Sequence, residues 1–214
     1  MKMLFFVLSL LLTIQLAGQE TAKQTYESPN LKKDIDQHKI VAILPFNATI
    51  SYRRPPKNFD EAQHKTDEKS LGTSLQNEMF TFLLRKKSDY TVDFQDVDKS
   101  NALLRKAGLF DKLDETTADS LSKVLGVDAI IKCSYSYEKT TSEGAAIAKT
   151  ILFGGIGSKT ASGLLVMQIK NGIDGELLWR FSKTMDETVF SSTSVLMERM
   201  MRKVSRNFPY EISK

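Results

Sequence analysis

The chain has 214 residues, of which 41% are hydrophobic and 26% are charged, and its formal net charge is +4. This length and composition are ordinary for a single globular domain. The small net charge gives no argument for a nucleic-acid partner, which would need a clustered basic face. The chain has one cysteine, Cys133, which excludes an intrachain disulfide.

Residues 1–18 have the three-part pattern of a bacterial secretory signal. A basic start with Lys2 precedes the apolar run Leu4–Leu16, and two small residues follow. The apolar run is short for a membrane span. Because Gln19 rather than a cysteine comes after Gly18, the pattern predicts cleavage at this point and no lipid anchor. The mature protein is therefore expected to be periplasmic or exported.

The polar segment 19–37 lacks periodicity, which predicts a flexible leader before a single domain at 38–210. The domain opens with the β-branched apolar run Lys39–Phe46, which is typical of a central strand covered on both faces. Pro45 is expected to end the hydrogen-bond ladder of this strand. Residues 47–65 are rich in Pro and Asn, so we expect a long loop there.

Helical periodicity and capping signals predict three helices in the middle of the chain. They run from Thr66 to about Lys87, from Asp96 or Asp98 to Gly108, and from Thr116 to Gly126. A short strand at 90–94 separates the first two helices.

Alternating apolar and polar residues predict strands at 127–138, 164–170 and 176–189. Gly and Asn at 171–175 favour a hairpin between the last two strands. A final helix is expected to begin after the caps at Ser191–Ser192.

In the last strand, alternation places Leu177, Trp179 and Phe181 on the core side and Arg180 on the opposite side. Crossover helices would make the early strands parallel, and the hairpin makes the late strands an antiparallel meander. The predicted fold is α/β (α+β), with a mixed sheet of about five strands and helices packed on it.

Several phrases of the sequence resemble an envelope family. They are the opening strand Lys39–Phe46 (KIVAILPF), the phrase Leu125–Ile131 (LGVDAII) and the phrase Asp174–Trp179 (DGELLW). The family comprises the curli-secretion channel lipoprotein, the amino-terminal domain of the Tol-system β-propeller protein and related small exported lipoproteins. The resemblance spans residues 38–208 as element order and short phrases. Asn207–Tyr210 at the end of the last helix is similar to uncharacterised exported proteins of Bacteroidetes-like bacteria. The resemblance implies an envelope setting and no catalytic residue, and the chain lacks the lipidated cysteine of the lipoprotein members.

The residue patterns predict no catalytic, cofactor or metal site. Gly154–Thr160 (GGIGSKT) lacks the glycine spacing of a phosphate-binding loop and is expected to be a flexible loop. His38 and His64 have no partner at zinc-ligand spacing. Cys133 alternates within a strand, so we expect a buried thiol rather than a nucleophile. The carboxylates of Asp111–Glu115, like those of Asp186 and Glu187, are expected to be solvated.

The segment 144–157 is apolar and rich in small residues, and it does not alternate like a barrel strand. It either packs on its own domain as a short helix or flap, or it contacts a partner or a membrane. The candidate contact residues are Ile147, Ile151, Leu152, Phe153 and Ile156.

Two function classes remain open. The first is a non-enzymatic exported envelope protein, an adaptor or assembly factor that binds another envelope protein. The second is a ring-forming secretion or pore subunit like the curli channel, which would need oligomers and membrane hairpins. A peripheral membrane contact is compatible with either class. A hydrolase is the weakest hypothesis because no nucleophile and base lie at a suitable spacing.

Overall fold

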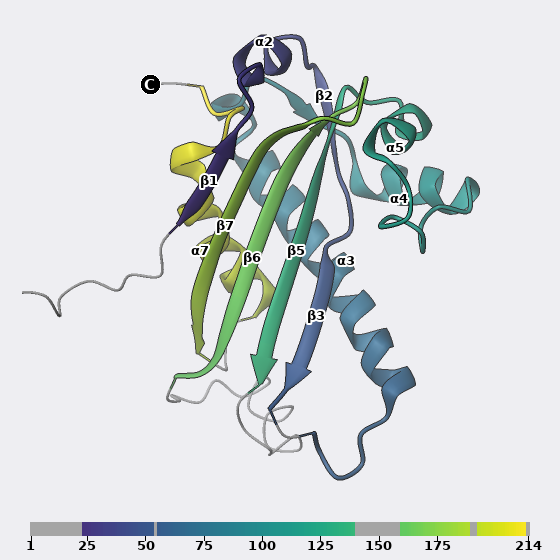
Figure 1. Ribbon diagram of the computed structural model, residues 1–214, viewed down its shortest axis with the longest axis vertical. Helices are drawn as coiled ribbons and strands as arrows, with labels where there is room; N and C mark the ends of the chain where they lie inside the picture. Colours follow the sequence, from purple (N-terminus) through teal and green to yellow (C-terminus); the bar gives the residue numbers. More distant parts are fainter. Residues whose placement is uncertain (1–22, 54, 140–158, 189–191, 213–214) are drawn as a thin grey trace, which may run out of the picture.

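The computed structural model describes residues 23–53, 55–139, 159–188 and 192–212 (Figure 1). In chain order, the strands and helices are β1 (Gln24–Glu27), α2 (Leu31–Ile35), β2 (Ile40–Ile43), β3 (Asn47–Tyr52), α3 (Glu61–Arg85), β4 (Asp93–Phe94), α4 (Val97–Lys106), α5 (Ala118–Leu125), β5 (Ala129–Lys139), β6 (Lys159–Asn171), β7 (Leu177–Thr188) and α7 (Thr193–Val204). A 3₁₀ turn, Ser205–Asn207, continues α7. None of the described helices is long and apolar enough to cross a membrane.

Seven strands of the described residues form one mixed sheet in the order β1-β7-β6-β5-β2-β4, and β3 also pairs with β5. The early strands β2, β3, β4 and β5 pair in parallel. The late strands β5, β6 and β7 form an antiparallel meander, and β1 is antiparallel to β7. The predicted mixed α+β fold is therefore confirmed, and β1 and β3 are additional to the strands expected from the sequence.

Helices cover the two faces of the sheet unequally. α3 and α7 lie behind the sheet in Figure 1 and enclose the larger core, to which β5 contributes Ile131, Cys133 and Tyr135. α4 and α5 lie on the other face and enclose a smaller core around Ala42 and Ile130. Successive strand residues point to opposite faces, so the alternation expected for β5 is confirmed.

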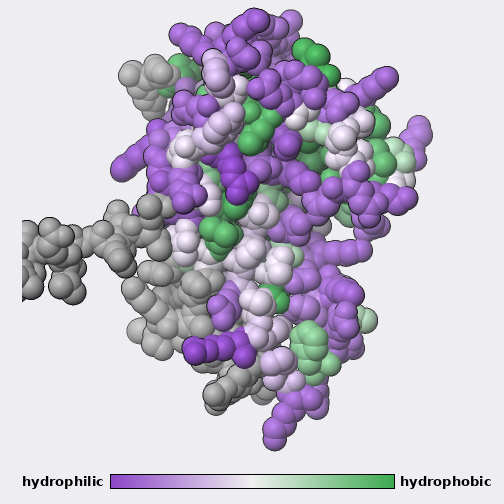
Figure 2. Space-filling model, viewed as in Figure 1, coloured by the Kyte–Doolittle hydropathy of each residue, from purple (hydrophilic) through white to green (hydrophobic). Residues whose placement is uncertain are grey.

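The remainder of the face that carries α4 and α5 is not covered by a described helix. β5 and β7 place small hydroxyl side chains there, namely Ser134, Ser136, Ser182 and Thr184, and Leu164 of β6 is 41% exposed among them. Figure 2 views this face and shows surface of mostly weak hydropathy over the middle of the sheet.

The predicted flexible leader is wrong for its second half. Residues 24–27 pair with β7 as strand β1, and the Ser28 amide donates to the Leu178 carbonyl at 2.8 Å. Leu31 and Ile35 of α2 then pack against the larger core. A strand that pairs through its backbone needs no apolar periodicity of its own. The polar sequence of β1 therefore gave no signal for a strand.

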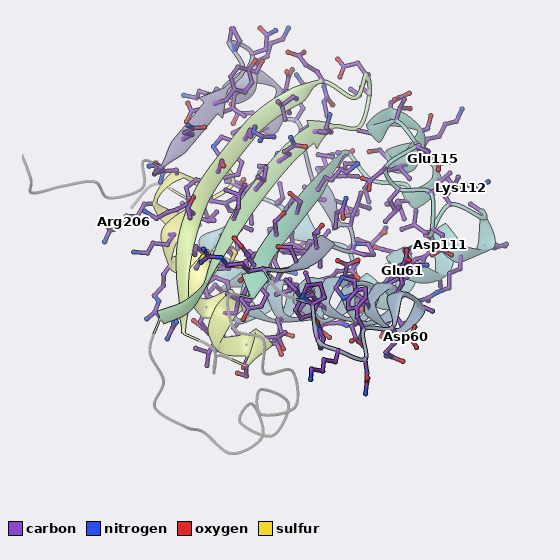
Figure 3. The ribbon with its side chains drawn as sticks, turned by 60° about the horizontal axis from the view of Figure 1, so that its bottom comes forward. Asp60, Glu61, Asp111, Lys112, Glu115 and Arg206 are labelled. Atoms are coloured by element: carbon purple, nitrogen blue, oxygen red, sulfur yellow. The ribbon has the colours of Figure 1, made fainter. Side chains whose placement is uncertain are left out.

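The predicted long loop at 47–65 is also wrong at both of its ends. Pro45 interrupts the strand for only a short bulge, and pairing with β5 resumes at Asn47, opposite Ser134. The following helix begins at Glu61 rather than near Thr66, because the carboxylate of Asp60 accepts hydrogen bonds from two amides of the first turn. Figure 3 shows Asp60 and Glu61 at this end of α3.

One side chain of β7 faces differently from the expected alternation. Trp179 and Phe181 are fully buried as predicted, but the fully buried residue before them is Leu178, whereas Leu177 is only half-buried. The register of β6 against β7 shifts between Ile169 and Lys170, so Leu178 is an extra residue in the ladder.

Candidate functional site

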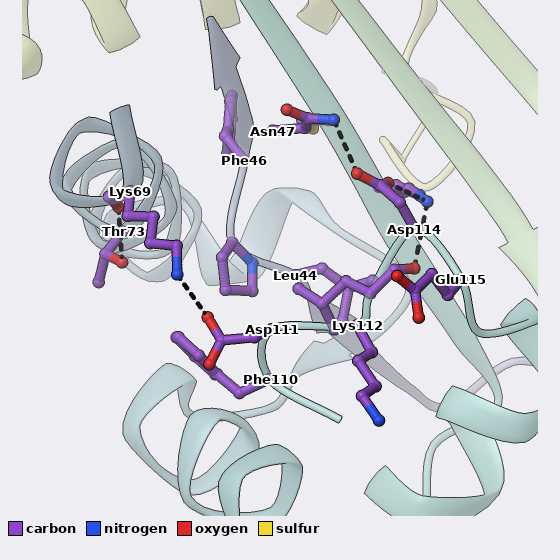
Figure 4. Close-up of a pocket in the computed structure, with 14 residues that line it drawn as sticks. Leu44, Phe46, Asn47, Lys69, Thr73, Phe110, Asp111, Lys112, Asp114 and Glu115 are labelled. Carbon is purple, nitrogen blue, oxygen red and sulfur yellow. Dashed lines mark hydrogen bonds and ion pairs between the residues drawn. The ribbon is translucent and has the colours of Figure 1, made fainter. Parts of the chain in front are cut away.

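A pocket of about 320 Å³ lies where β2 passes into β3 (Figure 4). One wall is α3, and the opposite wall is the α4–α5 loop (residues 107–117). Its lining residues are Leu44, Pro45, Phe46, Asn47, Lys69, Thr73, Phe110, Asp111, Lys112, Leu113, Asp114, Glu115, Lys132 and Cys133. A second pocket of about 260 Å³ shares Asp114, Glu115 and Lys132 with it.

The bulge at Pro45 builds the floor of the pocket, and α3 holds the bulge in place. The Phe46 amide leaves the sheet and donates to the Gly72 carbonyl at 3.2 Å. The Ile43 carbonyl accepts from Nε2 of Gln76 at 2.7 Å. These contacts satisfy backbone groups that the bulge removes from the ladder, as buried polar groups require. Glycine at position 72 allows α3 to lie this close to the bulge, because a Cβ there would overlap the Phe46 carbonyl oxygen.

A buried pair of amide side chains sets the second wall. Gln76 of α3 donates to Asn101 of α4 at 3.1 Å, Asn101 donates back at 2.9 Å, and both side chains are almost fully buried. Because every polar atom that they use is paired, the pair fixes α4 against α3 at little desolvation cost. α4 leads directly into the α4–α5 loop, so this pair also positions the loop.

Two ion pairs fasten the loop across the pocket. Nζ of Lys69 on α3 lies 2.8 Å from Asp111, and Nζ of Lys132 on β5 lies 2.7 Å from Asp114. Asn47 of β3 also donates to Asp114 at 2.8 Å (Figure 4). Ion pairs this exposed contribute at most about 1 kcal/mol each to stability. They therefore orient the loop but do not make it rigid.

The thiol in the lining of the pocket is not a reactive group. Burial raises the pKa of the Cys133 thiol far above its ordinary value, so it is protonated and a poor nucleophile. His64 packs against Tyr52 and Phe59 and lies 3.3 Å from Glu68, away from this lining. Within the described ranges, no three His, Cys, Asp or Glu residues are grouped so that they could hold a metal ion.

The site residues predicted from the sequence are not the residues that form this pocket. Ile147, Ile151, Leu152, Phe153 and Ile156 all lie outside the described residues, as does most of the Gly154–Thr160 motif. The pocket carboxylates Asp111 and Asp114 are exposed to solvent as expected, and they also pair with lysines of α3 and β5. Their sequence signal is weak, since alternating charges in a loop rarely mark a site. Lys112 and Glu115 extend outward from the same loop (Figure 3).

A second polar cluster joins the start of the domain to its end. Nδ1 of His38 lies 2.8 Å from the hydroxyl of Tyr210, and both side chains are buried. Asp128 accepts from the amides of Lys39 and Ile40 at 2.8 and 2.9 Å. Burial lowers the pKa of His38 below 6.5, and the charges of Asp128 and Asp34 only partly oppose this effect.

His38 should therefore make the protein less stable in mild acid. The unfolded chain protonates His38 near pH 6.5, whereas the native imidazole stays neutral to lower pH. The unfolded state thus binds more protons, and the free energy of unfolding falls as pH drops below about 6.5, by at most about 1.4 kcal/mol per unit. Urea denaturation at about pH 7.5 and pH 5 should show a smaller loss for His38→Gln than for the wild type. Equal losses would contradict this assignment.

No protein-family model matches the chain, and no curated protein matches it either. Among solved structures, it is similar to a PelC dodecamer from Paraburkholderia phytofirmans, with a TM-score of 0.43, 9% identity, and coverage of 89% of this chain and 99% of that one. Lipoprotein GNA1162 from Neisseria meningitidis has a TM-score of 0.40 at 11% identity, covering 81% and 99%. The LpoB C-terminal domain from Salmonella enterica has a TM-score of 0.35 at 9% identity, covering 74% and 94%.

These TM-scores are too low to carry an argument about function. The three structures include neither a curli-secretion channel nor a Tol-system protein, so the finer resemblance stays a prediction. Function is therefore argued from the residues of this chain.

Proposed function

We propose that the chain is an exported, non-enzymatic adaptor that binds a segment of another envelope protein in the pocket beside the β2–β3 bulge. The observation that carries this proposal is an apolar floor inside a rim of paired charges. The floor residues are Leu44, Pro45, Phe46, Phe110 and Leu113. The centre of a protein interface has this anatomy, with an apolar anchor site surrounded by polar groups.

The rim explains why an extended protein segment suits the pocket. The pairs Lys69–Asp111 and Lys132–Asp114 offer hydrogen-bond donors and acceptors on opposite sides of the floor. A segment that places one apolar side chain on the floor can bond its own backbone to these groups. The lysines and carboxylates of the rim balance each other in charge, so the rim does not favour a charged small molecule.

The setting of this function comes from the sequence. The predicted signal at 1–18 and the Gln at position 19 support export after cleavage without a lipid anchor. Burial keeps the Cys133 thiol protonated, so this thiol does not supply a nucleophile to the pocket.

A substitution that fills the pocket should abolish partner binding. Thr73 lines the pocket from α3, whereas Asn77, one turn later, is exposed outside it. Thr73→Arg and Asn77→Arg add the same charge to the same helix. In cells that export the protein, chemical crosslinking and mass spectrometry should recover a partner with the wild type and with Asn77→Arg. The yield should fall at least about tenfold with Thr73→Arg, as expected for a lost anchor contact.

Equal partner yields from both variants would overturn the pocket as the binding site. A recovered species made only of copies of this chain, with a matching mass by light scattering, would instead favour the ring-forming class.

A further inference from the structure

α7 has one face that nothing in the described structure covers. Five apolar residues pack its inner face into the larger core, namely Leu196, Met197, Met200, Met201 and Val204. The opposite face is basic and continues into the 3₁₀ turn, with Arg199, Arg202, Lys203 and Arg206 at helical spacing. Arg202, Lys203 and Arg206 are exposed, and Figure 3 shows Arg206 pointing away from the body of the molecule.

The positive charge of this face is not neutralised by its neighbours. Between the residues that the structure describes, no ion pair involves any of the four basic side chains. Glu198 is the only acidic residue of α7, and it pairs with Arg85 of α3 instead. Val195, which begins the same outer face, is 43% exposed.

The chain enters the described fold beside this face. Lys23 is the first described residue, and its ammonium group donates to the side chain of Asn207, directly after Arg206. The N-terminal end of the described fold therefore lies beside the basic face.

We infer that the basic face of α7 rests on an anionic lipid surface, which makes the protein a peripheral membrane protein. A basic helix face attracts anionic headgroups, and each Lys or Arg near the surface strengthens binding about fivefold. Val195 would meet the boundary of the headgroups, as apolar residues on such helices do. An acidic protein would also satisfy the charge, but the centre of a protein interface is apolar and poor in charges, whereas this face has four basic side chains around the exposed Val195. The inference is independent of the pocket.

Vesicle sedimentation tests this inference on the exported protein purified after secretion. The vesicles contain phosphatidylcholine alone or with phosphatidylglycerol. The first variant carries Arg202→Gln, Lys203→Gln and Arg206→Gln. The matched control carries Lys99→Gln, Lys106→Gln and Lys123→Gln, which removes three exposed charges from α4 and α5. Thermal melts confirm that both variants are folded.

The wild type should sediment with the anionic vesicles but not with the neutral ones. About 1 M salt should release it, because the screening length is then about 3 Å. The α7 variant should bind on the order of a hundredfold more weakly, whereas the control and Thr73→Arg should keep most of the binding. Sedimentation without a preference for anionic lipid would overturn the inference, as would equal losses in the two triple variants. Wild-type protein that sediments with neither kind of vesicle would overturn it as well, and would leave an acidic protein as the partner of this face.

Discussion

Trp179→Ala is expected to lower the free energy of unfolding by about 3–5 kcal/mol. Trp179 is fully buried in the larger core, where it stacks on Phe181 and meets the edge of Phe208 at centroid distances of 6.0 and 6.1 Å. Its indole N–H has no hydrogen-bond partner among the described residues. The loss therefore comes from packing and from the cavity that alanine leaves. It is a large share of the roughly 5–15 kcal/mol that stabilises a domain.

Arg180→Ala is the matched control, since Arg180 lies on the opposite face of the same strand. Its substitution should change the free energy of unfolding by no more than about 0.5 kcal/mol. Urea denaturation of the two variants measures both values. If both effects were small and equal, the register of β7 against β6 would be misassigned.

Gly72→Ala should destabilise the protein by about 3 kcal/mol, at the upper end of overpacking effects. Alanine is normally favoured over glycine inside a helix by about 1 kcal/mol, so the expected sign is the reverse of the ordinary one. The added Cβ would overlap the Phe46 carbonyl oxygen, which is backbone and cannot rotate away. α3 would have to move from the bulge and lose the bond between the Phe46 amide and the Gly72 carbonyl.

Ser70→Ala, at an exposed position of the same helix, serves as its control. It should change the free energy of unfolding by no more than about 0.5 kcal/mol. Chemical denaturation of the two variants gives the comparison. A Gly72→Ala protein as stable as the wild type would show that the backbone of α3 does not pack against the bulge as described.

Local chemistry made most of the fold predictable from the sequence. The alternation in 127–138 predicted which face of β5 is buried, because neighbouring side chains of a strand must point to opposite faces. Asp96 caps α4 through the Lys99 amide, and Ser192 caps α7 through the Val195 amide, as expected. Gly126 ends α5 with a φ of 68°, a conformation that glycine adopts without strain.

Long-range contacts account for what the sequence did not predict. Gln24–Glu27 becomes a strand only because β7 offers an open edge, and nothing in its own polar residues indicates that partner. The strand resumes after Pro45 because β5 continues beside it. The pocket depends on Asp111 and Asp114 meeting lysines from two other elements. The basic face of α7 is spread by helical spacing over 199–206, so it does not form a compact run in the sequence.

The pairing of β1 with β7 delays completion of the fold during synthesis, which starts at the N-terminus. Gln24 pairs with Ser182, and His38 contacts Tyr210, which lies 172 positions later. The first strand therefore has no partner until almost the whole chain has emerged, and pairings so distant in sequence form slowly. The last residues to be synthesised therefore close the domain.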